Sequence, residues 1–74
     1  MGKDYRKNLV SESPERLRYL SPREQTILRM RYGVGESEKP LKAIAKLFEV
    51  SEQTIRNHEA KAIRKLEKLP KEEN

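Results

Sequence analysis

The chain has 74 residues, 39% of them charged and 34% hydrophobic, and its 17 Lys and Arg against 12 Asp and Glu give a net charge of +5. This length allows one small domain and excludes an enzyme that encloses its substrate beside a separate cofactor fold. Cysteine is absent, which excludes disulfides and thiolate metal sites and favours a reducing compartment. The excess of positive charge indicates a polyanionic partner.

The N-terminal half predicts a tail, two helices and a loop. Residues 1–12 mix charged and polar side chains without a helical period, so we expect a flexible tail. A first helix follows from residue 13. The second begins at Ser21, which forms a capping box with Glu24, and ends at Gly33, a residue type that tolerates the left-handed conformation. Residues 33–40 then read as a loop because of their Gly, Pro and charged residues.

The C-terminal half predicts a helix-turn-helix. The apolar residues between Leu41 and Phe48 follow helical spacing on one face of a short helix. After a short break, Ser51 can cap a longer helix. Its apolar stripe is Ile55, His58, Ala62, Leu66 and Leu69. The sequence therefore predicts an all-α, four-helix domain over residues 13–69, with a frayed C-terminus at residues 70–74.

The face of the last helix opposite this stripe carries side chains suited to DNA. Gln53, Arg56 and Asn57 are residue types that read base edges, and Lys61 and Arg64 further along suit phosphates. Base readers first and cations later is the order expected of a recognition helix that enters the major groove by its N-terminus. The alternative is a solvated face that only forms intrahelical pairs.

Other chemistry has little support in the sequence. His58 is the single histidine, so no imidazole cluster can hold a metal, and its place on the apolar stripe favours packing. Ser21 and Ser51 are explained as helix caps, and no base lies at a spacing that indicates a hydrolytic site. We therefore expect no catalytic residue, no metal, no cofactor and no membrane-spanning segment.

Several blocks of the sequence, in this order, resemble region 4 of sigma-70-type bacterial sigma factors. They are Leu20-Ser21-Pro22-Arg23-Glu24, Leu28-Arg29-Met30-Arg31-Tyr32-Gly33, Leu41-Lys42-Ala43-Ile44-Ala45 and Glu59-Ala60-Lys61-Ala62-Ile63-Arg64-Lys65-Leu66. The resemblance implies a monomeric domain of the bacterial cytoplasm, associated with the nucleoid. Such a domain binds the −35 element of promoters while it is docked on the β-subunit flap of RNA polymerase.

The resemblance also assigns roles to residues. The positions that match base readers are Glu52, Gln53, Arg56 and Asn57. The positions that match contacts to the DNA backbone are Arg23, Arg31, Leu41, Lys42, Ser51, Lys61 and Arg64. A groove for the polymerase flap is expected from Leu17, Leu20, Ile27, Tyr32 and Val34. The segment Ser51-Glu52-Gln53-Thr54 differs from the family's usual Thr-Arg-Glu-Arg, which predicts that the preferred promoter hexamer also differs.

Two alternative functions remain open at this point. The segment from Ser51 to His58 also resembles the recognition helix of LuxR-type regulators, although the loop at residues 33–40 is longer than in that group. A second alternative is a protein-interaction module that an anti-sigma factor or an activator binds.

Overall fold

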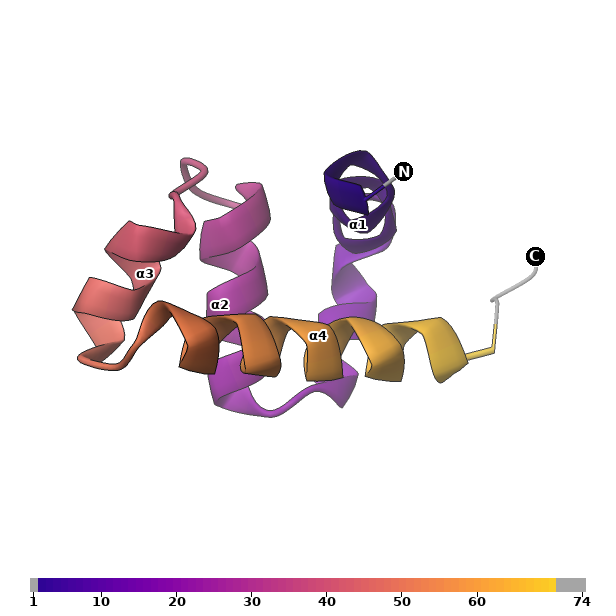
Figure 1. Cartoon of the computed structure of the whole chain (residues 1–74). Helices are drawn as coiled ribbons and strands as arrows, with labels where there is room; N and C mark the ends of the chain where they lie inside the picture. The colour runs from indigo at the N-terminus through magenta and orange to yellow at the C-terminus, as the bar shows by residue number, and fades with distance from the viewer. Residues whose placement is uncertain (1, 71–74) are drawn as a thin grey trace.

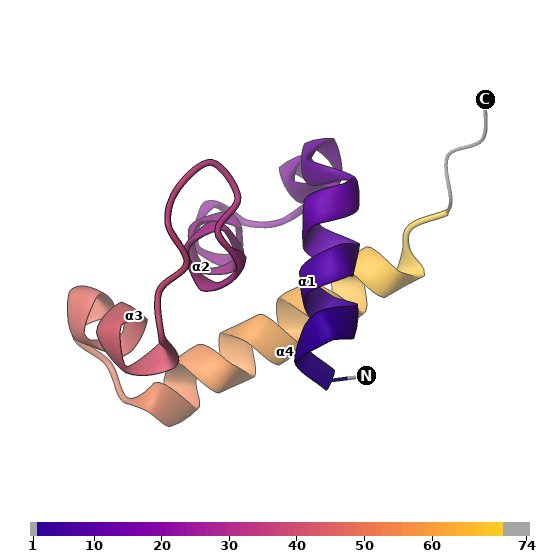
Figure 2. The same cartoon turned by 90° about the horizontal axis from the view of Figure 1, so that it is seen from above.

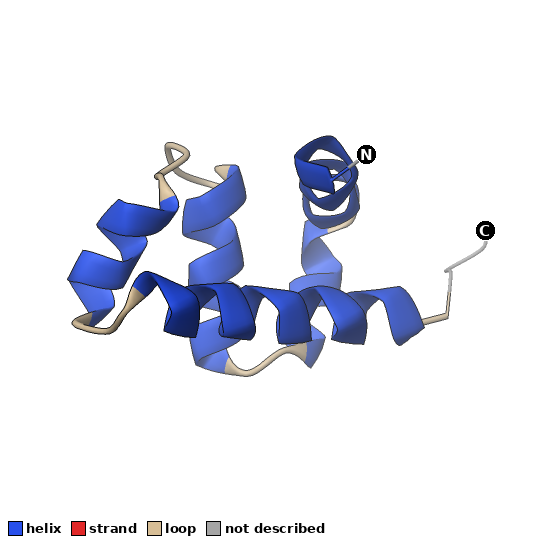
Figure 3. Ribbon diagram, in the orientation of Figure 1, coloured by secondary structure: helices blue, strands red, loops and turns tan. Residues whose placement is uncertain are grey.

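The computed structural model describes residues 2–70, with side chains described from Tyr5 onward. Its described residues form helices and loops without strands, as the colouring of Figure 3 shows, so the predicted all-α class is confirmed. The elements are α1 (Gly2–Glu12), the 3-10 helix η1 (Pro14–Tyr19), α2 (Pro22–Tyr32), α3 (Leu41–Phe48) and α4 (Glu52–Lys68). In Figure 1, α4 lies across the other helices as one long rod.

The predicted flexible tail at residues 1–12 is wrong for residues 2–12, which form α1. Val10 is fully buried and Leu9 packs against the same core, while the Tyr5 hydroxyl donates a hydrogen bond to Glu67 of α4 at 2.7 Å. Seen from above in Figure 2, α1 crosses over α4. The element predicted from residue 13 is a 3-10 helix, so the described residues hold five helical segments where four were expected.

The capping box predicted for the second helix is confirmed. The Glu24 amide donates to Ser21 Oγ at 3.2 Å, and the Ser21 amide donates to the Glu24 carboxylate at 3.0 Å. Burial alone would raise the pKa of Glu24, but the Ser21 amide and the ammonium of Lys65, 3.0 Å away, lower it below its ordinary value. Glu24 therefore caps α2 and also joins it to α4. Gly33 ends α2 in the left-handed conformation, with φ of 70°.

The predicted helix-turn-helix is also confirmed. Helix α3 is followed by its C-cap Glu49, which adopts a left-handed conformation with φ of 59° in the place where such turns often have Gly. The Val50 amide returns to the Ala45 carbonyl at 3.0 Å. Ser51 Oγ then accepts the Thr54 amide at 3.1 Å and begins α4. These bonds fix the angle between the two helices.

Two apolar clusters share α2 and α4. The first joins α1, η1, α2 and α4 through Val10, Leu17, Leu20, Leu28, Tyr32, Ala62, Ile63 and Leu66. The second joins α2, α3 and α4 through Ile27, Ile44, Ala45 and Ile55. Helix α4 thus presents one side to the whole core, and its opposite side stays free of packing.

The C-terminal end of α4 is held by an arginine of η1. One nitrogen of the Arg16 guanidinium donates to the Leu69 carbonyl at 2.9 Å and to the Pro70 carbonyl at 3.2 Å. Carbonyls at a helix C-terminus have no partner within the helix, and a cation there also interacts favourably with the negative end of the helix dipole. Of the predicted frayed segment, residues 71–74 lie outside the described residues.

The predicted groove for the polymerase flap is wrong as a surface. Leu17, Leu20, Ile27 and Tyr32 are all buried, and Val34 is half-buried against the first cluster. Leu17, Leu20 and Tyr32 belong to the first cluster, to which α1, which was not expected, supplies Leu9 and Val10. Ile27 belongs to the second cluster. A partner cannot reach the four buried side chains while the domain keeps this packing.

Candidate nucleic-acid interface

The predicted DNA-reading side chains lie on the exposed side of α4. Six of them are exposed to solvent: Glu52, Gln53, Arg56, Asn57, Lys61 and Arg64. They follow the helix from its first turn toward its middle, on the side away from the two apolar clusters. The amide of Gln53 donates to Asn57 Oδ1 at 3.0 Å, which holds these two adjacent polar side chains together.

The inner side of α4 departs from the predicted stripe at one position. His58, predicted to lie on the stripe, is half-buried, but its neighbour Glu59 is buried and only 4% exposed. The sequence predicts Glu24 as part of a helix cap, but it does not predict that Glu24 and Glu59 are buried. A buried carboxylate needs partners that replace water, and Glu59 has three.

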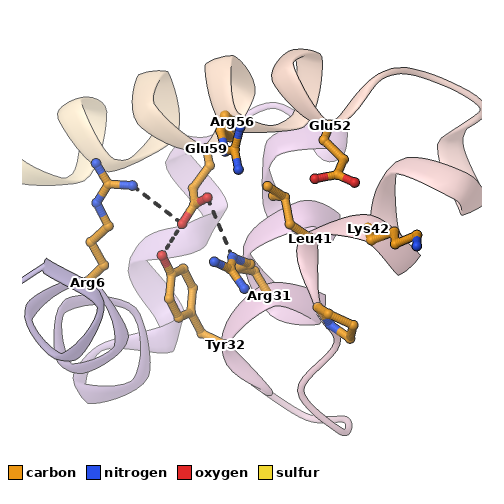
Figure 4. A pocket seen from close by; sticks show the side chains of 9 residues that line it. Arg6, Arg31, Tyr32, Leu41, Lys42, Glu52, Arg56 and Glu59 are labelled. Atoms are coloured by element: carbon orange, nitrogen blue, oxygen red, sulfur yellow. Dashed lines mark hydrogen bonds and ion pairs between the residues drawn. The ribbon is translucent and has the colours of Figure 1, made fainter.

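These three partners of Glu59 come from two other helices (Figure 4). The Tyr32 hydroxyl donates a hydrogen bond to Glu59 Oε2. The Arg6 guanidinium of α1 lies 3.5 Å from the same oxygen, and Arg31 Nε of α2 lies 3.6 Å from Oε1. Burial and the bond to this carboxylate raise the pKa of Tyr32, so the phenol stays protonated and remains a donor. The cluster joins α1, α2 and α4.

Beside this cluster lies a cavity of about 520 Å³. Its lining is Arg6, Arg31, Tyr32, Pro40, Leu41, Lys42, Glu52, Arg56 and Glu59. Figure 4 shows Arg6 at one end, Lys42 at the other and Arg31 between them. Four cations and two carboxylates line it, so the cavity has a surplus of positive charge.

The N-terminus of α3 opens on the same cavity. Pro40 precedes the helix and makes no side-chain cap, and Leu41 and Lys42 form its first turn. The first amides of a helix have no carbonyl partner within it and carry a partial positive charge. The cavity thus lies beside a helix N-terminus and is lined by cations, and both features favour anions.

The structure brings five predicted DNA residues together at the cavity: Arg31, Leu41, Lys42, Glu52 and Arg56. Four other predicted backbone contacts lie outside its lining, namely Arg23, Ser51, Lys61 and Arg64. Arg23 is exposed at the start of α2, with its guanidinium 5.9 Å from the centre of the Phe48 ring, and Ser51 uses its hydroxyl as the cap of α4. Sequence reasoning missed Arg6, because it treated residues 1–12 as a tail.

The comparison with protein families decides between the two resemblances. Residues 16–68 match the family described as Sigma-70, region 4. The chain belongs to this family. The match covers most of η1 and the whole of α2, α3 and α4, so the helix-turn-helix and every residue of the cavity lining except Arg6 lie within the matched region. The LuxR-type alternative loses its support.

Curated relatives of this region 4 domain are RNA polymerase sigma factors. The chain is 48% identical over 62 residues to RNA polymerase sigma factor SigA of Nostoc sp. and 50% identical over 62 residues to SigA1 of Synechococcus elongatus. Each alignment covers 81% of this chain and 16% of the relative. RpoD of Neisseria gonorrhoeae is 43% identical over 60 residues, which are 80% of this chain and 9% of that protein.

The chain therefore spans about a sixth of the length of the first two relatives. Among solved structures, the comparison found no match. Within the described part of the chain, no helix has both the length and the apolar character that a membrane crossing requires.

Proposed function

We propose that this region 4 domain binds double-stranded promoter DNA at the −35 element, with α4 in the major groove. The observation that carries the proposal is the division of α4 into two sides. The inner side fills both apolar clusters, while the outer side exposes residue types that read bases and contact phosphates. A helix held in this way can present its outer side to a groove without rearrangement.

Within this proposal, the exposed residues divide by position along α4. The base readers are the four side chains of the first two turns, Glu52, Gln53, Arg56 and Asn57. The contacts to the DNA backbone come from α2, α3, the turn and the middle of α4, namely Arg23, Arg31, Leu41, Lys42, Ser51, Lys61 and Arg64. Backbone contacts set the orientation of the domain on the duplex, and base contacts set its sequence preference.

We also propose that RNA polymerase is the second partner, through its β-subunit flap. Family membership supports this partner, and the residues predicted for its groove, Leu17, Leu20, Ile27 and Tyr32, are buried in the described structure. A single small domain with a few base contacts binds DNA weakly by itself. Attachment to polymerase raises the effective concentration of the domain at the promoter and so supplies most of the affinity.

The test is selection of bound duplexes from a random pool, with and without a flap fragment, followed by two substitutions on α4. Arg56→Ala should cost about 1–3 kcal/mol on the selected duplex and relax the preference at one base pair. Lys61→Ala should weaken selected and random duplexes alike and reduce the salt dependence of binding by about one phosphate contact.

Two outcomes would contradict this proposal. If Arg56→Ala weakens binding to the selected duplex and to random duplexes equally, α4 does not read bases as proposed. A flap fragment that binds the domain equally well with and without both substitutions, in a system where transcription is also unchanged, would favour a protein-interaction module instead.

A further inference from the structure

Among the described residues that line the cavity, Arg6 alone belongs to α1. The other cations of the lining come from the end of α2, the start of α3 and the first half of α4. The Arg6 side chain is 39% exposed, so its guanidinium reaches the cavity and still meets solvent. An element predicted to be a tail thus contributes a cation to the proposed DNA interface.

The local charges leave Arg6 able to take a second partner. Glu59 supplies one negative charge to two guanidinium groups, those of Arg6 and Arg31. Both separations, 3.5 and 3.6 Å, are ion-pair distances longer than a good hydrogen bond. The buried Arg31 Nε has no hydrogen-bond acceptor. Since a guanidinium has five N–H donors, the pair keeps donors for an anion in the cavity.

We infer that Arg6 is a further contact of the domain with a DNA phosphate, on the strand that passes over the cavity. This inference rests on the proposed function and extends it to α1. Arg6, Arg31 and Lys42 are spread across one lining, on the side of α4 that faces the start of α3 (Figure 4). A phosphodiester strand that follows the edge of the groove meets these cations in succession.

The neighbouring residue provides a matched control. Lys7 follows Arg6 on α1 and carries the same charge, but it does not line the cavity. Its ammonium lies 3.2 Å from the carboxylate of Glu38, in the loop before α3. Lys7→Ala therefore removes one positive charge from the same helix without removing a donor from the cavity.

The first experiment compares Arg6→Ala with Lys7→Ala in the full chain, with circular dichroism to confirm that both variants are folded. Arg6→Ala should weaken binding roughly threefold to tenfold on selected and random duplexes alike. The slope of log K against log salt should fall by about 0.9, the value for one phosphate contact. Lys7→Ala should change affinity less than about twofold and leave the slope unchanged. Equal behaviour of the two variants overturns the inference.

A second experiment separates a phosphate contact from a purely structural role of Arg6 beside Glu59. Single phosphates of the selected duplex are replaced one at a time by neutral methylphosphonates. One replacement should weaken the wild-type domain and leave Arg6→Ala unaffected, because the two changes remove the same contact. Arg6→Lys should retain part of the sensitivity to that phosphate. If every replacement weakens both proteins equally, Arg6 acts through packing and the inference fails.

Inorganic phosphate distinguishes the source of the anion. At constant ionic strength, millimolar phosphate should leave the difference between Arg6→Ala and wild type unchanged. If phosphate competes with the duplex for binding to the wild-type domain but not to Arg6→Ala, the cavity is a site for free phosphate and the inference is overturned. If Arg56→Ala and Lys61→Ala weaken binding as expected while Arg6→Ala matches Lys7→Ala, this inference alone fails. If the wild-type domain binds no duplex, the proposed function fails with it.

Discussion

Glu59 is the residue at which the core and the proposed interface meet. Its carboxylate is buried beside the first apolar cluster, and it also lines the cavity. Tyr32, Arg6 and Arg31 share it, so one side chain fixes positions on three helices. Buried polar clusters of this kind stabilise a fold when every member has a partner and destabilise it when one is removed.

We predict that Glu59→Gln lowers the free energy of unfolding by about 1–3 kcal/mol. The amide keeps an acceptor for the Tyr32 hydroxyl, but it removes the charge that compensates two guanidinium groups. Urea denaturation followed by circular dichroism measures the loss.

Glu67→Gln is the control for this substitution. Glu67 is an exposed carboxylate of the same helix and accepts the hydroxyl of Tyr5. Its replacement should cost less than about 0.5 kcal/mol, because solvent screens exposed charges. Equal costs at the two positions would show that the Glu59 cluster contributes nothing beyond surface electrostatics.

At the scale of single residues, contacts between neighbours in the sequence were predictable and contacts between distant positions were not. Ser21 with Glu24, Gly33 and Ser51 were recognised as caps, since each cap involves residues at most a few positions apart. The burial of Glu59 depends on Tyr32 and Arg6, 27 and 53 positions earlier in the chain. The spacing of residues within α4 therefore could not predict that Glu59 is buried.

At the scale of elements, the turn between α3 and α4 contains a residue in a strained backbone conformation. Glu49 is the one described residue other than Gly with positive φ. The left-handed conformation costs an L-residue about 1–2 kcal/mol, and Gly adopts it freely.

We predict that Glu49→Gly raises the free energy of unfolding by about 0.5–1 kcal/mol, with part of the gain offset by the greater freedom of Gly in the unfolded chain. Glu49→Ala should give no such gain, because Ala keeps the Cβ atom that causes the strain. Thermal denaturation of the two variants measures the difference. If the two variants have the same thermal midpoint, the left-handed conformation at position 49 is not the source of strain.

The predictability of each element followed the strength of its local signal. Helices α2 and α4 combine side-chain caps with helical spacing of apolar residues, α3 has the spacing alone, and all three were predicted. Helix α1 has only Leu9 and Val10 as apolar residues packed in the core, too few for a period. Its structure follows from packing against α2 and η1, and such packing overrides weak local preference.

At the scale of the whole molecule, the two apolar clusters are joined by α2 and α4 rather than by a single centre. Because α4 supplies Ile55 to one cluster and Leu66 to the other, neither cluster can come apart while α4 stays fully packed. A domain of 74 residues has a total stability of about 4–11 kcal/mol, so the loss of one large contact affects all of it.

We predict that Ile44→Ala, in the second cluster, lowers the stability of the first cluster by the same amount, about 2–4 kcal/mol. NMR signals of the Leu66 methyl groups and the helical signal in circular dichroism should give one common transition. Leu47→Ala is the control, since Leu47 lies on the same helix but is 60% exposed. A Leu66 transition that stays at its wild-type midpoint would show that the clusters unfold separately.

The two-sided use of α4 has a consequence for how such a domain can change its target. Glu52, Gln53 and Asn57 are exposed and belong to neither apolar cluster, so their replacement leaves the scaffold intact. Substitution of Ile55 or Ala62, one or a few positions away, would undermine folding before recognition could be altered. Under the proposed function, new promoter preferences can therefore arise by mutation along one edge of the helix, with little effect on the stability of the fold.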